Sequence, residues 1–299
     1  MQALWMLLAS FFFASMAVCV KVAAAWFTSA EQVFYRGLLG MLFMWLLARQ
    51  QRVPLATRYP GMHAWRSLVG VLSLGAWFYA IGKLPLATAM TLNYMSSVWI
   101  ATFLVGGALV AWNPRKGGSA PLRQGVLVLT VLSGFAGVIM MLRPTIDQDQ
   151  LFAGLVGLLS GFASAFAYMQ VMALGKLGEP EARTVFYFAV GSAVAGAAGM
   201  VVSGLSPWDW RHALWLLPIG VLASLGQLCM TRAYSRGATL VVASLQYFGI
   251  VFGAIYSVSL FGDRIPLSGW AGMGLIVASG VAATALRSHA APDAPGEGH

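Results

Sequence analysis

The sequence predicts an all-α polytopic membrane protein, with ten transmembrane helices arranged as two inverted five-helix repeats. Three observations lead to this fold class. Only 9% of the 299 residues are charged and 59% are hydrophobic, whereas a soluble domain carries about a quarter charged residues. Apolar runs long enough to cross a bilayer recur from one end of the chain to the other. Finally, one polar motif occurs in both halves of the chain.

The apolar runs define the predicted helices. A helix needs about 20 apolar residues to cross the hydrocarbon core of a bilayer. Pro121 and Pro266 stand where two of the runs begin, because the first turn of a helix tolerates the missing N–H of proline. The predicted helices span residues 2–25, 30–48, 63–82, 86–110, 122–142, 151–175, 182–203, 211–233, 238–261 and 266–286.

An amide–tyrosine pair marks an internal duplication. Gln246-Tyr247 follows Asn93-Tyr94 by 153 positions, the difference between 93 and 246, and each pair comes after a short basic turn. The recurrence of both turn and pair at one offset indicates a repeat. The predicted domains are residues 1–145 as the first five-helix repeat, residues 146–287 as the second, inverted repeat, and residues 288–299 as a disordered cytoplasmic tail.

Each predicted repeat has five helices, an odd number, so the two halves cross the membrane in opposite senses. The basic turn at Lys83 then faces one side of the membrane, and its counterpart at Arg236 faces the other. Inverted repeats around a central cavity are typical of transporters, whose halves exchange conformations to open the cavity to either side.

Basic residues predict the orientation, because lysine and arginine accumulate in cytoplasmic turns. If the N-terminus is cytoplasmic, most of them lie in predicted cytoplasmic turns and the tail: Arg49, Arg52, Arg58, Arg66, Arg115, Lys116, Arg123, Lys176, Arg183, Arg232, Arg236 and Arg287. The other side holds Lys83, Arg143, Arg211 and Arg264. Both termini are therefore predicted to be cytoplasmic.

These features resemble the drug/metabolite transporter superfamily, specifically its ten-helix EamA type and, among those, the YddG-like amino-acid exporters. The resemblance covers about residues 3–287. It rests on Arg36, the two amide–tyrosine pairs, the Phe261-Gly262-Asp263 end of helix nine, and the glycine-rich fifth and tenth helices. The chain departs from the family at Asp263, where relatives usually have glutamate, and at Val110, where many relatives keep an acid.

The resemblance implies an exporter of small metabolites, with amino acids as the expected substrates, that works by alternating access in the cytoplasmic (inner) membrane. It implies neither enzymatic activity nor a cofactor. The expected partners are a small-molecule substrate and membrane lipid, and a monomer and a homodimer are equally compatible with the sequence. The basic residues are scattered over many turns, so no nucleic-acid partner is expected.

The candidate substrate site consists of polar and aromatic side chains inside the predicted helices. Amides and hydroxyls present both donors and acceptors to a zwitterion. The same groups can instead hydrogen-bond a neighbouring helix, and both interpretations stay open. The candidates are Asn93, Tyr94, Gln246, Tyr247, Trp77, Tyr79, Ser164, Tyr168 and Gln227.

Two charged residues fall within or near the first two predicted helices. Lys21 is close enough to the outer end of its helix to extend its ammonium group to the interface. Arg36 lies about two turns into the second helix, where Glu31, Asp263 or backbone carbonyls are candidate partners. Asp263 is also expected to cap the last helix. We expect no fixed acid or base near the midplane, so that neutral dipoles would bind the substrate.

Two other functions would require specific sequence features. A flippase of lipid-linked or polyprenyl-phosphate-linked substrates would need a laterally open apolar groove with a cationic site, for which Lys21 or Arg36 could serve. An intramembrane metalloprotease would need a His-Glu-x-x-His helix, and the four histidines lie at helix ends or in the tail. Cys19 and Cys229 lie inside apolar segments and are predicted to be buried free thiols that bind no metal.

The predicted topology places Lys83 and Arg264 outside the cytoplasm. Single cysteines at these two positions, in a background free of cysteine, are expected to react with an impermeant thiol reagent in intact cells. Protection of both positions would show that the orientation is reversed.

Overall fold

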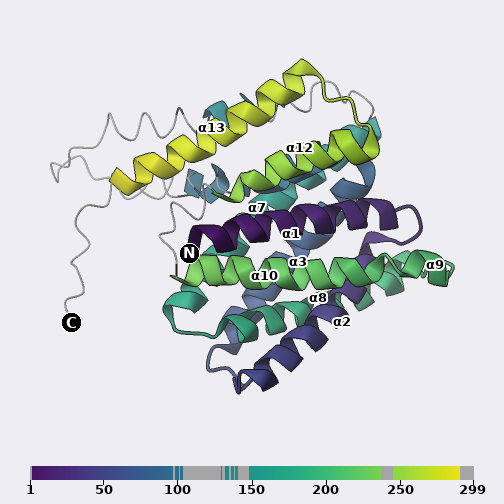
Figure 1. The fold of residues 1–299 in the computed structure, drawn as a ribbon, viewed down its shortest axis with the longest axis vertical. Coiled ribbons are helices and arrows are strands. Elements are labelled where there is room, and N and C mark those ends of the chain that lie inside the picture. Colours follow the sequence, from purple (N-terminus) through teal and green to yellow (C-terminus); the bar gives the residue numbers. More distant parts are fainter. Residues whose placement is uncertain are drawn as a thin grey trace.

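The computed structural model describes residues 2–96, 148–236 and 245–289, together with 98–100, 102–103, 129, 132–134, 136–137 and 139–140. Within these residues the secondary structure is entirely helical. The helices lie roughly along one another and form an elongated bundle (Figure 1). The predicted span 122–142 and the predicted repeat boundary at residue 145 lie largely or wholly outside the described residues.

The described helices follow six of the other predicted spans with small shifts at their ends, whereas the fourth, eighth and ninth predicted spans are interrupted. In the first half they are α1 (Gln2–Ala23), α2 (Ser29–Gln50), α3 (Pro60–Lys83) and α4 (Leu86–Tyr94). In the second half they are α7 (Gln148–Lys176), α8 (Glu181–Ser203), α9 (Trp210–Ala213), α10 (Leu216–Arg236), α12 (Phe248–Phe261) and α13 (Leu267–His289). Five of the described segments are long and apolar enough to cross a membrane: 4–23, 60–83, 150–176, 181–203 and 210–234.

Local sequence explains several helix ends. Thr28 and Glu31 form a capping box at the start of α2, in which the Thr28 N–H donates to the Glu31 carboxylate at 2.7 Å. This arrangement satisfies backbone donors that the first turn leaves unpaired. At the end of α12, Gly262 adopts a φ of 64°, in the left-handed region that favours glycine.

Three expectations about helix boundaries are corrected. Asp263 does not cap the last helix: α13 begins at Leu267, and the Asp263 carboxylate accepts a hydrogen bond from the Ser257 hydroxyl at 2.6 Å. The predicted eighth helix is divided into α9 and α10, because Leu214 and Trp215 form a turn between them. The predicted tail from residue 288 begins inside α13, which continues to His289.

The fourth and ninth predicted helices are both interrupted at the amide–tyrosine pair. Met95 is a turn residue directly after α4, and Tyr247 is a turn residue directly before α12. At the second pair, the Ser10 hydroxyl of α1 donates to the carbonyl oxygens of Leu245 and Gln246, at 3.4 Å each. Such irregular backbone is tolerated at membrane depth where protein surrounds it or it lines a cavity.

Helix contacts follow a regular pattern. α1 packs against α10, and α3 packs against α7; α2 packs against α8, and α4 against α12. Figure 1 shows α1 lying between α10 and α12, and α2 lying beside α8. This is the pattern that a twofold axis would produce if it exchanged α1 with α7, α2 with α8, α3 with α10 and α4 with α12.

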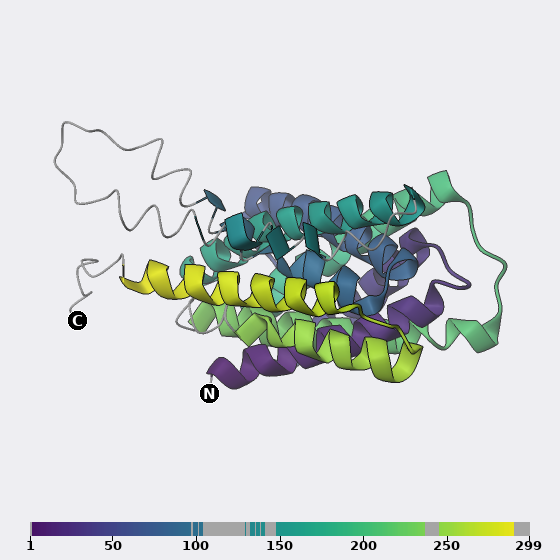
Figure 2. The ribbon, with the colours of Figure 1, turned by 90° about the horizontal axis from the view of Figure 1, so that it is seen from above.

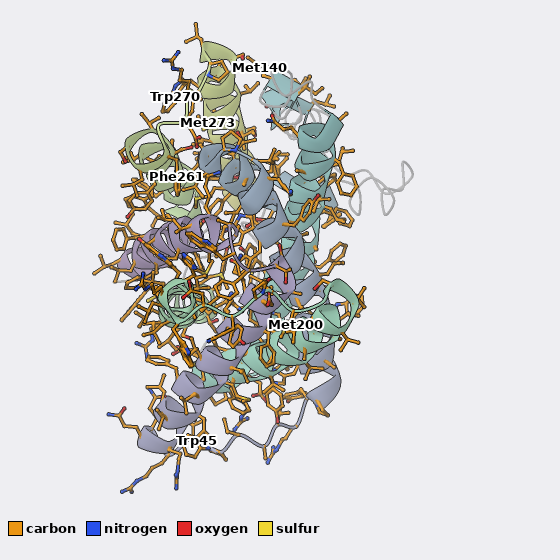
Figure 3. The ribbon with its side chains drawn as sticks, turned by 90° about the vertical axis from the view of Figure 1, so that its right-hand side faces the viewer. Trp45, Met140, Met200, Phe261, Trp270 and Met273 are labelled. Carbon is orange, nitrogen blue, oxygen red and sulfur yellow. The ribbon has the colours of Figure 1, made fainter. Side chains whose placement is uncertain are left out.

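The two ends of the bundle differ in the chain segments that they carry. α1 begins and α13 ends at the same end of the bundle, on the left in Figure 1. Figure 2 shows the connection from α8 to α9 at the opposite end. In the view of Figure 3, Trp45 of α2 and Trp270 of α13 lie at opposite edges of the bundle, and both side chains are exposed. Exposed apolar side chains around the bundle suit contact with lipid.

Gly37 of α2 packs closely against the backbone of α8. A Cβ at Gly37 would lie 2.8 Å from the Cα of Ala193 and 2.9 Å from the carbonyl oxygen of Ala189. We expect Gly37→Ala to lower the free energy of unfolding by about 1–3 kcal/mol, because α8 would have to move. Thermal unfolding in detergent measures this effect. Gly274→Ala is the control, since its Cβ would meet no described atom within 4 Å; equal stability of the two variants would contradict the packing argument.

Candidate substrate cavity

A small cavity with mostly buried lining residues lies between the helices of both halves. Its volume is about 40 Å³, enough for a few water molecules but smaller than an amino acid. Seven helices supply its lining, which is Phe13, Met16, Arg36, Arg66, Gly70, Ser73, Leu74, Trp77, Asn93, Tyr94, Ser164, Ala167, Tyr168, Phe188 and Gln227. The cavity thus combines aromatic faces, neutral dipoles and two guanidinium groups.

Six of the nine candidate residues from the sequence line this cavity. They are Trp77, Asn93, Tyr94, Ser164, Tyr168 and Gln227. They come from α3, α4, α7 and α10, so the helix packing brings together residues that are far apart in the chain.

The other three candidates lie outside the lining. Tyr79 packs edge-on against Phe152 of α7, with 6.1 Å between the ring centroids. The Gln246 amide oxygen accepts a hydrogen bond from the Tyr234 hydroxyl at 2.7 Å, and the Tyr234 ring stacks on Tyr168 at 5.8 Å. Gln246 therefore lies behind the lining residue Tyr168, to which Tyr234 connects it. Tyr247 is buried beside it at the start of α12.

Asn93 belongs to a hydrogen-bonded cluster that joins three helices. Its amide nitrogen donates to the hydroxyls of Ser160 and Ser164 on α7, at 3.1 and 3.2 Å. Ser73 of α3 donates to the Ser160 carbonyl at 2.9 Å and shares a hydrogen bond with the Ser164 hydroxyl at 2.5 Å. These contacts hold the Asn93 side chain in a fixed position at the cavity wall.

Arg66 was assigned to a cytoplasmic turn, and that assignment is wrong. Because α3 begins at Pro60 and not at residue 63, Arg66 lies in the second turn of the helix, with its side chain buried against the cavity. Its guanidinium carbon lies 4.1 Å from the centroid of the Phe188 ring. The proline at residue 60 was the sequence signal for the earlier start, since proline is favoured in the first turn.

Arg36 lines the same cavity from α2. Its Nη1 donates to the Ser192 hydroxyl at 3.2 Å, and its guanidinium carbon lies 5.0 Å from the Phe188 ring centroid. Two arginines therefore share one aromatic ring, in cation–π geometry. The expectation that no fixed charge lies near the site is overturned by this pair.

Gly70 makes room for the Arg66 side chain. A Cβ at Gly70 would lie 2.8 Å from the Cε2 atom of Phe188 and would overlap the Nη1 atom of Arg66. Arg66 and Gly70 are four residues apart and hence on the same face of α3. The absence of a side chain at residue 70 thus lets the guanidinium lie against the helix and the Phe188 ring.

The two acidic candidates for pairing with Arg36 are engaged elsewhere. Glu31 accepts hydrogen bonds from Thr28 and from the N–H of Ser206, the latter at 2.8 Å. Asp263 accepts from Ser257. Among the residues that the structure describes, no carboxylate lines the cavity, so its lining carries net positive charge.

Polar contacts close the end of the bundle that is predicted to be extracytoplasmic. The Lys21 ammonium donates to the Leu84 carbonyl at 2.7 Å and lies 5.3 Å from the ring centroid of Phe261. Ser257 accepts from the Ala87 N–H at 3.2 Å. These contacts link α1 to the turn between α3 and α4, and α12 to the start of α4. Figure 3 shows the position of Phe261 at the end of α12.

Ion pairs close the opposite end. Glu179, between α7 and α8, pairs with Arg183 at 2.9 Å and lies 3.6 Å from His63 of α3. Arg232 of α10 pairs with Glu181 at 3.1 Å and lies over the Trp5 ring of α1 at 4.9 Å. The cavity therefore lies between two sets of polar contacts, one at each end of the bundle.

A multi-pass helical bundle around a polar cavity is the architecture of a membrane transporter. Comparison with known proteins places the chain within this class. The EamA-like transporter family matches residues 151–284. The chain is 34% identical to the pseudopaline exporter CntI of Pseudomonas aeruginosa over 259 residues, which are 87% of each protein.

The chain therefore belongs to the EamA-like transporter family, in the drug/metabolite transporter superfamily. An uncharacterized transporter of Helicobacter pylori is 28% identical, over 92% of this chain and 91% of that protein. A solved crystal structure has the same fold, with a TM-score of 0.67 at 16% identity, over 97% of this chain and 98% of that one. The relatives are transporters, and the chain is not an enzyme.

Asn93 is the candidate whose contacts are best defined. We expect Asn93→Ala to lower transport at least severalfold, while each lost hydrogen bond destabilises the fold by only about 0.6–2 kcal/mol. Initial transport rates and thermal unfolding of the same preparations separate the two effects. Thr91→Val is the control, because the Thr91 hydroxyl bonds to Ala87 within its own helix and does not line the cavity. If Asn93→Ala transports normally, or loses transport only because it unfolds, then the Asn93 amide has a structural role and does not bind substrate.

Proposed function

We propose that the protein exports small metabolites, with amino acids as the expected substrates, across the cytoplasmic membrane by alternating access between two inverted five-helix repeats. The observation that carries this proposal is the polar cavity between the predicted halves. Arg36, Arg66 and Asn93 come from the first half, and Tyr168 and Gln227 from the second. A site shared in this way changes its exposure whenever the two halves rock against each other.

Two observations support the inverted repeat. The pairs of packed helices are the ones that a twofold exchange of the halves predicts. The two amide–tyrosine pairs also have corresponding helix neighbours. The Ser10 hydroxyl of α1 donates to the carbonyl oxygens of Leu245 and Gln246. A Cβ at Gly161 of α7 would lie 3.1 Å from the Asn93 carbonyl and closer still to that of Leu92. The first helix of each half thus packs against the motif of the other half.

The contacts at the two ends of the bundle support alternating access. The hydrogen bond of Lys21 and the ion pairs of Glu179 and Arg232 lie on opposite sides of the cavity. Both sets are formed while the cavity is small, which is the arrangement that an occluded state would require. Breaking one set while the other stays formed would open the cavity to one side and let it expand around a substrate.

The flippase alternative has an observation of its own, a lateral groove of about 940 Å³ between α3, α7 and α8. Its lining is mainly apolar and includes Leu68, Leu72, Leu159 and Val194. A lipid phosphate would need a cation within this groove, but Lys21, Arg36 and Arg66 do not line it. The guanidinium groups line the small cavity instead, and this separation favours export of a small polar metabolite.

A transport screen with purified protein in liposomes tests the proposal. We expect counterflow of one or more radiolabelled amino acids above that of protein-free liposomes, saturating at low affinity because dipoles and hydrogen bonds must also release the substrate. A nucleotide sugar and a fluorescent lipid phosphate are the comparison substrates. Movement of the lipid phosphate alone would support a flippase and contradict the export of metabolites.

A further inference from the structure

The two arginines of the cavity specify the chemistry of its ligand. We propose that the transported metabolite carries two carboxylates, as an acidic amino acid or another small dicarboxylate does, and that Arg36 and Arg66 bind these carboxylates beside Phe188. The inference rests on the proposed export function and narrows its substrate class.

Charge is the first argument. The side chains of Arg36 and Arg66 are only 4% and 3% exposed, and among the described residues no carboxylate lines the cavity with them. A buried cation without a counter-charge is strongly destabilising, and an anion that enters the cavity removes that penalty. The lining is therefore matched in charge to an anion.

Unpaired hydrogen-bond donors are the second argument. Among the described residues, the Nε atoms of both arginines and the Nη1 atom of Arg66 are buried without a hydrogen-bond partner. The Nη2 atom of Arg66 reaches the Gln227 amide oxygen only at 3.5 Å. Adjacent N–H groups of a guanidinium match the two oxygens of a carboxylate in geometry. Each arginine thus offers donors that its protein neighbours leave unused.

The third argument concerns the number of carboxylates on the ligand, which follows from the presence of two arginines. Both guanidinium groups lie within about 5 Å of one ring, at 5.0 Å for Arg36 and 4.1 Å for Arg66, so the two positive charges repel each other. One carboxylate neutralises one of them and leaves the other without a counter-charge, whereas a second carboxylate neutralises it as well.

The first measurement compares two substrates that differ in one group. In proteoliposomes we expect kcat/KM for L-glutamate to exceed that for L-glutamine by about tenfold or more, because a charge-assisted contact is stronger than a neutral one. Equal transport of the two by the wild-type protein would overturn the inference.

The second measurement detects binding without transport. Succinate should raise the thermal unfolding temperature of the detergent-solubilised protein more than butyrate or inorganic phosphate does at equal ionic strength. A larger shift with phosphate than with succinate would assign the arginine pair to a phosphate ligand and overturn the carboxylate assignment.

Two kinds of variant test whether the arginine pair produces the preference for glutamate over glutamine. Arg36→Gln and Arg66→Gln should each reduce the preference for glutamate over glutamine about tenfold. Gly70→Ala keeps both charges but should displace the Arg66 guanidinium, because the new Cβ overlaps it, and should lower the same preference. Gly75→Ala on the same helix, where a Cβ meets no described atom within 4 Å, should keep the wild-type preference. An unchanged preference in folded Arg66→Gln or Gly70→Ala protein would contradict the assignment.

Failure of the inference is distinguishable from failure of the proposed function. If neutral amino acids are transported as well as glutamate, the export function stands and the dicarboxylate assignment is wrong. If succinate stabilises the protein but no amino acid or dicarboxylate is transported, the binding site stands and the export function is wrong.

Discussion

The burial of two guanidinium groups beside one phenyl ring is the constraint on which the centre of this transporter depends. A bilayer offers no water to polar groups, so each must find its partners within the protein. Arg36 obtains a hydroxyl from Ser192 and the face of Phe188, and Arg66 obtains the same ring and a distant amide from Gln227. Within the part of the chain that the structure describes, donors of both arginines remain unpaired, and these are the groups to which we assign the carboxylates of the ligand.

Close backbone packing makes that arrangement sterically feasible. Glycine at residue 37 lets α2 approach α8, the helix that carries both Phe188 and Ser192. Gly70 leaves space for the Arg66 side chain along α3. In membranes, small residues are what allow helices to come this close, because hydrophobic burial does not favour helix–helix contact over contact with lipid. The glycines therefore act on the binding site through geometry.

The contacts in the cavity wall differ in kind from the contacts at the two ends of the bundle. The cluster of Asn93, Ser160 and Ser164 fixes the wall formed by α4 and α7. The contacts at the two ends, by contrast, involve charged side chains, such as Lys21 at one end and Glu179 and Arg183 at the other. Charged groups near the ends of the helices can exchange these partners for water, whereas the buried wall is held by hydrogen bonds within the bundle. The proposed alternating access requires both properties, a constant site and ends that open in turn.

The sequence by itself determined the membrane class, most of the helix spans within the described residues, the amide–tyrosine pairs and six of the side chains that line the cavity, because apolar length and polar residues inside apolar runs are local properties of the chain. It did not reveal that Arg66 lies in the cavity. α3 begins three residues earlier than predicted, and this places Arg66 in the second turn of the helix, with its side chain buried. Nor could it pair Arg36 with Ser192, which follows it by 156 positions. Only the tertiary structure decided those contacts, because the packing of α2 and α3 against α8 determines which groups surround each charge.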